Sequence, residues 1–433
     1  MRGSRTTLRS LADGATGDPV TSASLRGQRE SLVRALALVV VVAWNVRTLL
    51  AVVGAASGTI EKELDDGGAV TGSISTILVF AAAIAAPLAL VAVRRSSVWL
   101  VTGLSLALLA AAQLGLGLGG TQVVFVASLF AGLGAGMIGA LTPSLVARLL
   151  PHHVGLGVGV FMVGASVGFY AASIAVPWAL DRGGSWTHVA VVLASLAALS
   201  VAVWAVSPYA RRASGSASDV GTDDAAGAAR LSMFARLPSW VVVVIVYLCV
   251  QSISVFAVIA WTAPTLVEAG ASLSTASVAL GLVSGLQVVT GLALPLVAQR
   301  TGKAPVLMLA AAGAVLVGSV AFVAVVTGSA LAWSWVGVTL LAFGHGGSFA
   351  LATFVVAHKA PDARSAVTFG AMMMFYSQVA GACGPFAFGW LRDVSGGYVV
   401  PWVLLSAVAA LQVVSAVVLV RLFARDALRS AHH

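Results

Sequence analysis

Residues 32–56 read LVRALALVVVVAWNVRTLLAVVGAA, an apolar run in which Arg47 is the only Lys or Arg expected at the depth of a bilayer. A run of this length is long enough to cross a membrane, which takes about 20 mainly apolar residues in a helix. A charge inside a membrane is costly, so such residues usually face a bundle interior or a water-filled cavity and mark a substrate pathway. The stretch therefore predicts a polytopic membrane protein that handles an anionic or strongly dipolar compound.

The composition of the whole chain agrees with this interpretation. Of its 433 residues, 59% are hydrophobic and only 9% are charged, whereas about 25% of an ordinary soluble protein is charged. The net charge of +9 comes from short basic clusters between apolar runs, as in the cytoplasmic loops of membrane proteins. No contiguous basic stripe is present, so we do not expect nucleic-acid binding. Cys249 and Cys383 both lie within apolar runs, which does not indicate a disulfide framework.

Hydropathy divides the chain into twelve predicted spans and therefore predicts an all-α membrane protein with two six-helix bundles. The spans lie at about 32–56, 71–93, 97–118, 121–147, 154–179, 187–207, 239–262, 274–298, 304–327, 330–357, 365–390 and 399–423. A polar stretch rich in Ser, Gly, Ala, Asp and Arg separates the sixth span from the seventh. We expect a disordered cytoplasmic tail at 1–31, bundles at 32–207 and 239–424, a cytoplasmic linker at 208–238 and a second cytoplasmic tail at 425–433.

The basic residues also predict the orientation of the spans. With the N-terminus inside the cell, all but four of the 24 Lys and Arg lie on the cytoplasmic side, as the positive-inside rule requires. The exceptions are Arg47 within the membrane and Lys62, Arg182 and Arg392 outside. We therefore expect a multi-pass protein of the cell membrane with both termini in the cytoplasm. The basic residues expected to act in gating are Arg94, Arg95, Arg148, Arg300 and Arg364.

The two halves show weak internal similarity. Leu90 to Arg94 reads LVAVR after the second span, and Leu296 to Arg300 reads LVAQR after the eighth. The same spacing carries Asn45 in the first span onto Gln251 in the seventh. Together with the central linker, these matches predict two six-helix repeats, with the substrate bound between them near the membrane midplane.

Several motifs suggest chemistry that their context does not support. Gly134 to Gly139 reads GAGMIG and fits a dinucleotide-binding fingerprint, but that fingerprint requires a preceding strand. In the middle of an apolar span, small residues indicate close helix packing instead. The seven histidines have no metal-ligand spacing. No nucleophile–base pair appears in the spans either, so we expect neither an enzyme nor a bound metal or cofactor.

His345 has two interpretations that the sequence leaves open. It lies within the tenth span beside three glycines, where it either hydrogen-bonds to a neighbouring carbonyl or acts as a cavity-facing donor or proton carrier. No Asp or Glu falls near the middle of any predicted span. If transport is coupled to protons, His345 is thus the only mid-span side chain that titrates near neutrality. The alternatives are that the substrate carries the proton, or that transport is uniport or exchange.

Arg47 also has two interpretations. Its planar guanidinium suits carboxylate-like anions, while the structural alternative is an arginine that helix carbonyls neutralise. No mid-span carboxylate is available to pair with it, which favours the substrate-facing role. Residues at a similar depth that would complete a polar pocket are Trp44, Asn45, Gln251 and His345. Tyr247, Trp261 and Tyr376 are candidates for aromatic walls, although each is equally compatible with an interfacial or packing role.

Four stretches carry a resemblance to a known family: Asn45-Val46-Arg47, Leu141 to Gly155, Gln251 to Pro264, and Gly346 to Asp393. Together with twelve spans in two halves, they resemble the major facilitator superfamily, and within it the cyanate permease and 2-nitroimidazole transporter branch. The resemblance covers about residues 33–420 and implies a transporter of small anions or nitroheterocycles. In two places the chain departs from the superfamily. The acidic loop motif after the second span is reduced to Arg94-Arg95, and the Gly-Pro motif of the fifth span in many antiporters is absent.

The sequence thus supports a secondary transporter, monomeric in the lipid bilayer, that moves a small anion or small polar heterocycle by alternating access. Arg47 would supply the positive charge, and Asn45, Gln251 and His345 would donate hydrogen bonds, which offset the cost of desolvating an anion. One alternative is an exporter of amphipathic drugs, which would depend on aromatic and Met side chains such as Met162 and Met372. The other is a membrane sensor that binds a ligand without transporting it.

Overall fold

The computed structural model of the protein describes residues 22–64, 68–118, 120–151, 153–211 and 237–431. No β-strand occurs in these ranges, and the predicted all-α fold is confirmed. The first half contains α2 (Ser22–Trp44), α3 (Thr48–Leu64), α4 (Gly68–Arg95), α5 (Val98–Leu118), α6 (Thr121–Leu149), α7 (Val154–Leu180) and α8 (Trp186–Val206). The second half contains α10 (Ser239–Glu268), α11 (Leu273–Thr301), α12 (Ala304–Val326), α13 (Trp333–Lys359), α14 (Ala363–Ser395) and α15 (Val399–Ala431).

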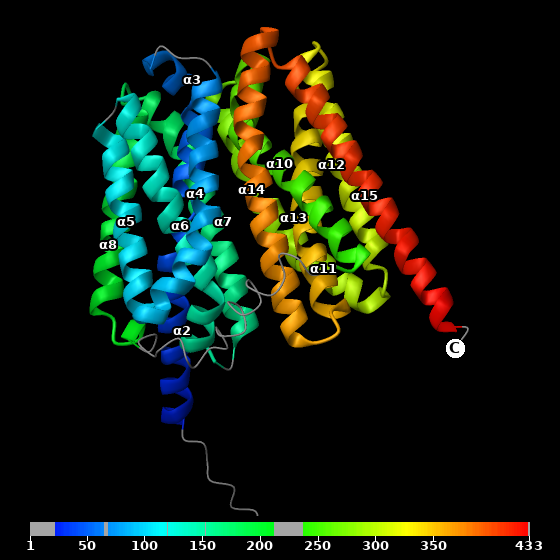
Figure 1. Ribbon diagram of the computed structural model, residues 1–433. Helices are drawn as coiled ribbons and strands as arrows, with labels where there is room; N and C mark the ends of the chain where they lie inside the picture. The colour runs from blue at the N-terminus through cyan, green and yellow to red at the C-terminus, as the bar shows by residue number, and fades with distance from the viewer. Residues whose placement is uncertain (1–21, 65–67, 119, 152, 212–236, 432–433) are drawn as a thin grey trace, which may run out of the picture.

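The helices match the predicted spans, but one of them, α14, is less apolar than the others. Eleven stretches of the described chain are long and apolar enough to cross a membrane, and the first of them combines α2 and α3 into one span, Arg29–Glu63. The predicted eleventh span corresponds to α14, which has 33 residues but is not among these eleven. Polar residues such as Ser377 and Gln378 lower its hydropathy. It nevertheless packs along α10 and α4 in the middle of the molecule (Figure 1).

The same helix pairings recur in the two halves, which stand side by side in Figure 1. In the first half, α4 packs on α6 and α5 packs on α8. In the second half, α11 packs on α13 and α12 packs on α15. Across the boundary, α4 lies against α14, α7 against α11, and α3 against α10. Three helices therefore line the boundary from each side, which is where the repeats predict the substrate site.

The predicted N-terminal tail is shorter than expected. Residues 1–21 lie outside the described part of the chain, but α2 begins at Ser22. The segment between Ser22 and the predicted span contains Leu, Arg, Gln and Glu, which favour helix, and Glu30 forms an i,i+4 ion pair with Arg34 at 3.4 Å. It therefore continues the first span as a helix instead of belonging to a disordered tail. Residues 212–236 of the predicted linker lie outside the described residues.

Glycines permit the closest helix contacts. In the GAGMIG stretch, a Cβ at Gly134 would meet the backbone of α5 at Ser105, and a Cβ at Gly136 would meet the backbone of α4 at Ala82. The packing interpretation of this stretch is confirmed, because α6 lies directly against both helices. Gly168 of α7 approaches the Trp44 carbonyl of α2 in the same way.

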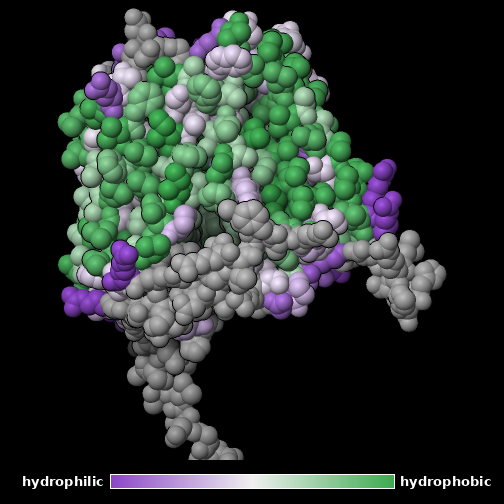
Figure 2. All heavy atoms as spheres, in the orientation of Figure 1, coloured by the Kyte–Doolittle hydropathy of each residue, from purple (hydrophilic) through white to green (hydrophobic). Residues whose placement is uncertain are grey.

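The two ends of the molecule differ. At one end, called here the terminal end, α2 begins and α15 finishes (Figure 1). At the other, the distal end, α3 and α4 of the first half contact α14 of the second half through hydrogen bonds and an ion pair. Figure 2 shows an apolar surface around the middle of the molecule and a recess between the halves toward the terminal end. The halves are therefore closed at the distal end.

Candidate functional site

Arg47 lies at an interruption of the first span. The helix α2 ends at Trp44, α3 begins at Thr48, and the three residues between them form a turn. The Val46 amide donates to the Ala43 carbonyl at 3.1 Å, and the regular bonding resumes with the Ala51 amide on the Arg47 carbonyl at 3.2 Å. The Arg47 side chain is partly exposed and makes no hydrogen bond or ion pair within the described residues.

Polar side chains of the first half form hydrogen bonds on both sides of this turn. Asn45 is buried, and its Nδ2 donates to the Val41 carbonyl at 2.9 Å and to Ser200 Oγ of α8 at 3.0 Å. On the other side, Thr48 Oγ1 donates to the Asn45 carbonyl at 3.1 Å and accepts a bond from Gln113 Nε2 of α5 at 2.9 Å. Asn45 was predicted to donate to substrate, whereas both of these donor contacts lie inside the first bundle.

A second polar group lies inside the second half. The Gln251 Nε2 of α10 donates to the His345 carbonyl of α13 at 3.4 Å, and His345 Nε2 lies 3.5 Å from Ser254 Oγ. His345 is 1% exposed, and its Nδ1 is buried with no hydrogen-bond partner among the described residues. Gln251 and His345 were both predicted as site residues, and they come together here. Neither forms a hydrogen bond with Arg47 in the described structure.

Tyr247 belongs to a neighbouring network that joins four helices of the second half. Its hydroxyl donates to the Met308 carbonyl at 3.0 Å and lies 2.7 Å from Ser348 Oγ. The same Ser348 oxygen accepts a bond from Gln412 Nε2 of α15 at 3.0 Å. Tyr247, Ser348 and Gln412 are all fully buried. The polar group of Tyr247 is therefore directed into the bundle of the second half.

Trp261 and an inter-half ion pair lie at the distal end. The Trp261 ring is fully buried, stacks on Phe388 with centroids 5.7 Å apart, and donates from Nε1 to the Pro385 carbonyl at 2.9 Å. Beside it, Arg392 of α14 bonds to Glu61 of α3 at 2.8 Å. Burial raises the pKa of Tyr398, which therefore stays neutral against the Arg392 guanidinium 5.0 Å from its ring.

Asp393 adds a cap to this contact from the opposite half. Its two carboxylate oxygens accept hydrogen bonds from the amides of Gly68 at 2.9 Å and Ala69 at 2.7 Å. These are the first residues of α4, and a helix leaves its first four amides without intrahelical partners. The negative charge also suits the positive end of the helix dipole. Asp393 thus joins α14 to the N-terminus of α4.

About two turns deeper, Thr76 of α4 inserts its hydroxyl against α14. Thr76 Oγ1 donates to the Ala382 carbonyl at 2.6 Å and accepts a bond from the Phe386 amide at 3.2 Å. Those two backbone groups are four residues apart and pair with each other in a regular helix. Pro385 lies between them inside α14, at a position where proline disturbs helical hydrogen bonding. Gly72 makes room for the approach, since a Cβ there would meet the Pro385 carbonyl at 2.5 Å.

The remaining predicted site residues lie apart from these groups. Tyr376 is 41% exposed and meets Phe375 edge to face. Trp44 is partly exposed at the end of α2. Among the predicted gating residues, Arg95 and Arg300 are exposed at helix ends and Arg148 is partly buried. The side chains of Arg94 and Arg364 lie outside the described part of the structure.

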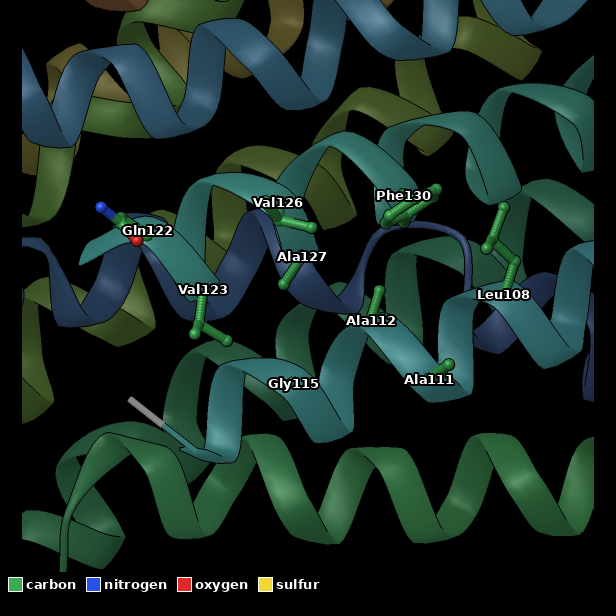
Figure 3. A pocket seen from close by; sticks show the side chains of 9 residues that line it. All are labelled: Leu108, Ala111, Ala112, Gly115, Gln122, Val123, Val126, Ala127 and Phe130. Carbon is green, nitrogen blue, oxygen red and sulfur yellow. The ribbon is translucent and has the colours of Figure 1, made fainter. Parts of the chain in front are cut away.

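One groove of the described structure is not part of this site. It has a volume of about 510 Å³ and lies between α5 and α6, as Figure 3 shows. Its lining is Leu108, Ala111, Ala112, Gly115, Gln122, Val123, Val126, Ala127 and Phe130. Gln122 is the only polar side chain among them, so the groove offers little to a polar solute. In the described ranges, no three His, Cys, Asp or Glu side chains are grouped to hold a metal ion.

Several residues in these networks were not among the predicted site residues. They are Thr48, Thr76, Gln113, Ser200, Ser348, Gln412 and the Glu61, Arg392 and Asp393 cluster. A signal was available for Gln113 and Gln412, because an amide in the middle of an apolar span is costly unless it finds a partner. No such signal marked the distal cluster, since charged residues at loop ends are ordinary.

Comparisons with known proteins identify the family. The model of the Major Facilitator Superfamily matches residues 36–385. The uncharacterized transporter YycB of Bacillus subtilis (strain 168) is 24% identical over 382 residues, which cover 87% of this chain and 90% of that protein.

Solved structures agree on the fold. A structure of the nucleoside transporter NupG has a TM-score of 0.71 at 14% identity, covering 89% of this chain and 99% of that one. An inward-facing bacterial homologue of the human lysosomal transporter Spinster has a TM-score of 0.71 at 15% identity and covers 92% and 98%. The D-xylose–proton symporter has a TM-score of 0.68 at 15% identity, with 89% and 96% covered. The chain therefore belongs to the major facilitator superfamily and is a multi-pass membrane transporter.

Proposed function

We propose that the protein is a secondary transporter of a small anion, and that Arg47 binds the anion between the two halves. The observation that carries this proposal is the position of Arg47 at the interruption between α2 and α3. Its side chain forms no hydrogen bond or ion pair with any described residue. A guanidinium in a membrane is costly, and an anionic ligand would offset that cost. Its donors also suit a carboxylate-like anion.

The interruption itself supports an anionic ligand. It places the N-terminus of α3 within the first span, directly after Arg47. The N-terminus of a helix carries a partial positive charge and unpaired amides, and discontinuous helices of several transporters direct such ends at anionic substrate groups. Arg47 and α3 would therefore act on the same ligand. The ligand chemistry that fits is a small monovalent anion such as cyanate, or a nitroheterocycle with anionic character, as in the branch that the sequence resembles.

The transport cycle follows from the two ends of the molecule. By the positive-inside rule, the terminal end faces the cytoplasm and both termini are cytoplasmic, in the cell membrane. The structure, closed at the distal end, would then be an inward-facing state of a monomeric transporter that works by alternating access. His345 remains the candidate for proton coupling, because it is a buried imidazole with one unpartnered ring nitrogen in the second half.

The test is uptake of labelled cyanate into proteoliposomes containing wild type, Arg47→Ala or Arg47→Lys, with and without an imposed pH gradient. We expect saturable uptake by wild type, loss of at least tenfold in Arg47→Ala, and partial retention in Arg47→Lys because the charge remains. Arg34→Ala is the matched control, since Arg34 belongs to the same span but is exposed and paired with Glu30.

Each alternative has its own outcome. Uptake that Arg47→Ala leaves at the wild-type rate would refute the role of Arg47. An exporter of amphipathic drugs would transport such compounds equally well without Arg47. A change of uptake with the pH gradient that His345→Gln abolishes would support proton coupling through His345.

A further inference from the structure

The interrupted turn at Arg47 is held by a continuous chain of hydrogen bonds from other helices. Starting in α5, Gln113 Nε2 donates to Thr48 Oγ1 at 2.9 Å, and Thr48 Oγ1 donates to the Asn45 carbonyl at 3.1 Å. From the same residue, Asn45 Nδ2 donates to Ser200 Oγ of α8 at 3.0 Å. The chain therefore crosses the interruption and ends in a different helix on each side.

These side chains are enclosed by the first half. Gln113 and Thr48 are 0% exposed, Asn45 is 1% exposed and Ser200 is 8% exposed. Hydrogen bonds of buried groups in a low-dielectric interior are expensive to leave unmade, so the bonds made by Gln113 Nε2, Thr48 and Asn45 favour one local geometry. Gln113 Oε1 is buried without a hydrogen-bond partner among the described residues. No solute approaching from the boundary between the halves has access to fully enclosed donors. Direct binding of substrate is therefore a poor explanation for this network.

The network does act on the backbone that carries Arg47. The Thr48 hydroxyl donates a hydrogen bond to the Asn45 carbonyl. In an uninterrupted helix, that carbonyl would accept a hydrogen bond from the Leu49 amide. Asn45 and Thr48 are thus both hydrogen-bonded to other helices. Arg47 lies between them, and its side chain forms no hydrogen bond or ion pair within the described residues. The backbone on both sides of Arg47 is consequently held by residues that form no hydrogen bond with its side chain.

We propose that Gln113 and Ser200, acting through Thr48 and Asn45, are positioning residues that hold the interrupted turn so that the Arg47 guanidinium faces the anion-binding space. The proposal rests on the proposed function of Arg47 and adds to it a cause for the geometry. An anion gains most from a charged donor that is already in place, because ordering the donor on binding costs affinity. Loosening the turn should therefore weaken binding more than it slows transport at saturation.

The decisive variants are Thr48→Val, which removes the hydroxyl that joins Gln113 to Asn45 at nearly constant volume, and Thr48→Ser, which keeps it. Gln113→Leu tests the same link from α5. In the cyanate uptake assay, we expect Thr48→Val and Gln113→Leu to raise KM about tenfold, the effect of about 1.4 kcal/mol of lost binding, and to change Vmax less than twofold. Thr48→Ser should restore KM to near the wild-type value.

The matched control is Thr142→Val. Thr142 is a buried threonine of α6 whose hydroxyl bonds only to the Ile138 carbonyl of its own helix, at 2.9 Å. It should leave KM unchanged. The midpoint of thermal unfolding of each variant in detergent shows whether the bundle remains folded. If Gln113→Leu does not fold, Thr48→Val alone decides the test.

A second readout does not depend on the identity of the substrate. Phenylglyoxal modifies accessible arginine side chains, and mass spectrometry of the peptide that contains Arg47 gives its rate of modification in the purified full-length protein. We expect Thr48→Val and Gln113→Leu to change this rate at least threefold, with Thr48→Ser and Thr142→Val close to wild type. A positioning role predicts this change, whereas a role in general bundle stability does not.

The failure of this proposal is distinct from the failure of the proposed function. If Arg47→Ala transports cyanate as wild type does, the proposed function is wrong, and the phenylglyoxal measurement alone decides whether the network orients Arg47. If Arg47→Ala loses uptake while Thr48→Val keeps both the wild-type KM and the wild-type modification rate, the positioning role is overturned.

Discussion

Single buried polar side chains determine how helices meet inside each half. In the second half, the Tyr247 hydroxyl bonds to the Met308 carbonyl and to Ser348, and Gln412 completes the group from α15. Four helices thus share one network of buried side chains. A second network in the first half joins α5, the first span and α8 through hydrogen bonds of Gln113, Asn45 and Ser200. A few hydroxyl and amide groups therefore fix contacts that apolar side chains alone would leave free to slide.

The Tyr247 hydroxyl gives a stability prediction at this scale. Tyr247→Phe keeps the ring and removes both hydrogen bonds, leaving the Met308 carbonyl and Ser348 without this partner. We expect a loss of about 1 kcal/mol in the free energy of unfolding, since interhelical hydrogen bonds in membrane proteins contribute about 0.6 kcal/mol on average. Thermal unfolding in detergent measures it. Tyr376→Phe is the control, because Tyr376 is 41% exposed, and an equal shift in both variants would contradict the assignment.

Among the elements, α14 has the largest role at the boundary between the halves. It packs along α10 in its own half and along α4 in the other. Asp393 near its end accepts the first two amides of α4, and Arg392 pairs with Glu61 of α3. The cap of one helix is therefore supplied by a helix of the opposite half. Separation of the halves at the distal end requires that this cap be given up.

Removal of that cap should shift the protein toward a state open at the distal end. Loss of a capping side chain costs about 1 kcal/mol or slightly more, so Asp393→Ala should raise the population of the open state several-fold. Spin labels on Lys62→Cys and Ser274→Cys, in a background with Cys249 and Cys383 replaced by Ala, report the distance between the distal ends of α3 and α11. We expect a larger fraction of long distances.

The control for this measurement is Asp181→Ala. Asp181 is an exposed residue that ends α7 at the distal end and takes no part in the contact with α14. A distance distribution identical to wild type in Asp393→Ala would show that the cap does not hold the distal end closed.

The elements also show what the sequence could and could not predict. Hydropathy placed a span over each described helix, with α2 and α3 combined in one, because a bilayer imposes length and apolarity on each span. It gave no sign of the interruption at Asn45 to Arg47, since a turn stabilised by Gln113 and Ser200 depends on side chains distant in sequence. The proposed role of Arg47 follows from the cost of a charge in a membrane. The directions of Asn45 and Tyr247 could not be inferred, because the same polar residue serves a bundle interior or a cavity equally well.

At the scale of the whole molecule, closure of the distal end depends on how near α4 and α14 can come. Gly72 allows this approach, because a Cβ at that position would meet the Pro385 carbonyl at 2.5 Å and the Phe386 Cα at 3.0 Å. Both atoms belong to the α14 backbone, so neither is free to give way as the end of a flexible side chain would. Distal closure is thus sensitive to a single methyl group.

Gly72→Ala should therefore hinder closure and slow the transport cycle. We expect faster hydrogen–deuterium exchange in the distal turns of α4 and α14, together with uptake reduced by fivefold or more. Gly58→Ala is the matched control, since a Cβ at Gly58 of α3 would meet no atom within 4 Å. Exchange that remains at the wild-type rate in Gly72→Ala would show that the two helices accommodate the methyl group without opening.

The Thr76 hydroxyl has a consequence for the energy of the transport cycle. It lies between the Ala382 carbonyl and the Phe386 amide, two groups that are each other's natural partners in a helix. When the halves separate, α14 can pair these groups with one another, and Thr76 can donate to the carbonyl four residues back in α4. Each of the three groups then exchanges one hydrogen-bond partner for another, and none is left unpaired. In a membrane, an unpaired backbone group costs several kcal/mol. The two conformations can thus remain close in free energy, as a carrier that must visit both in every turnover requires.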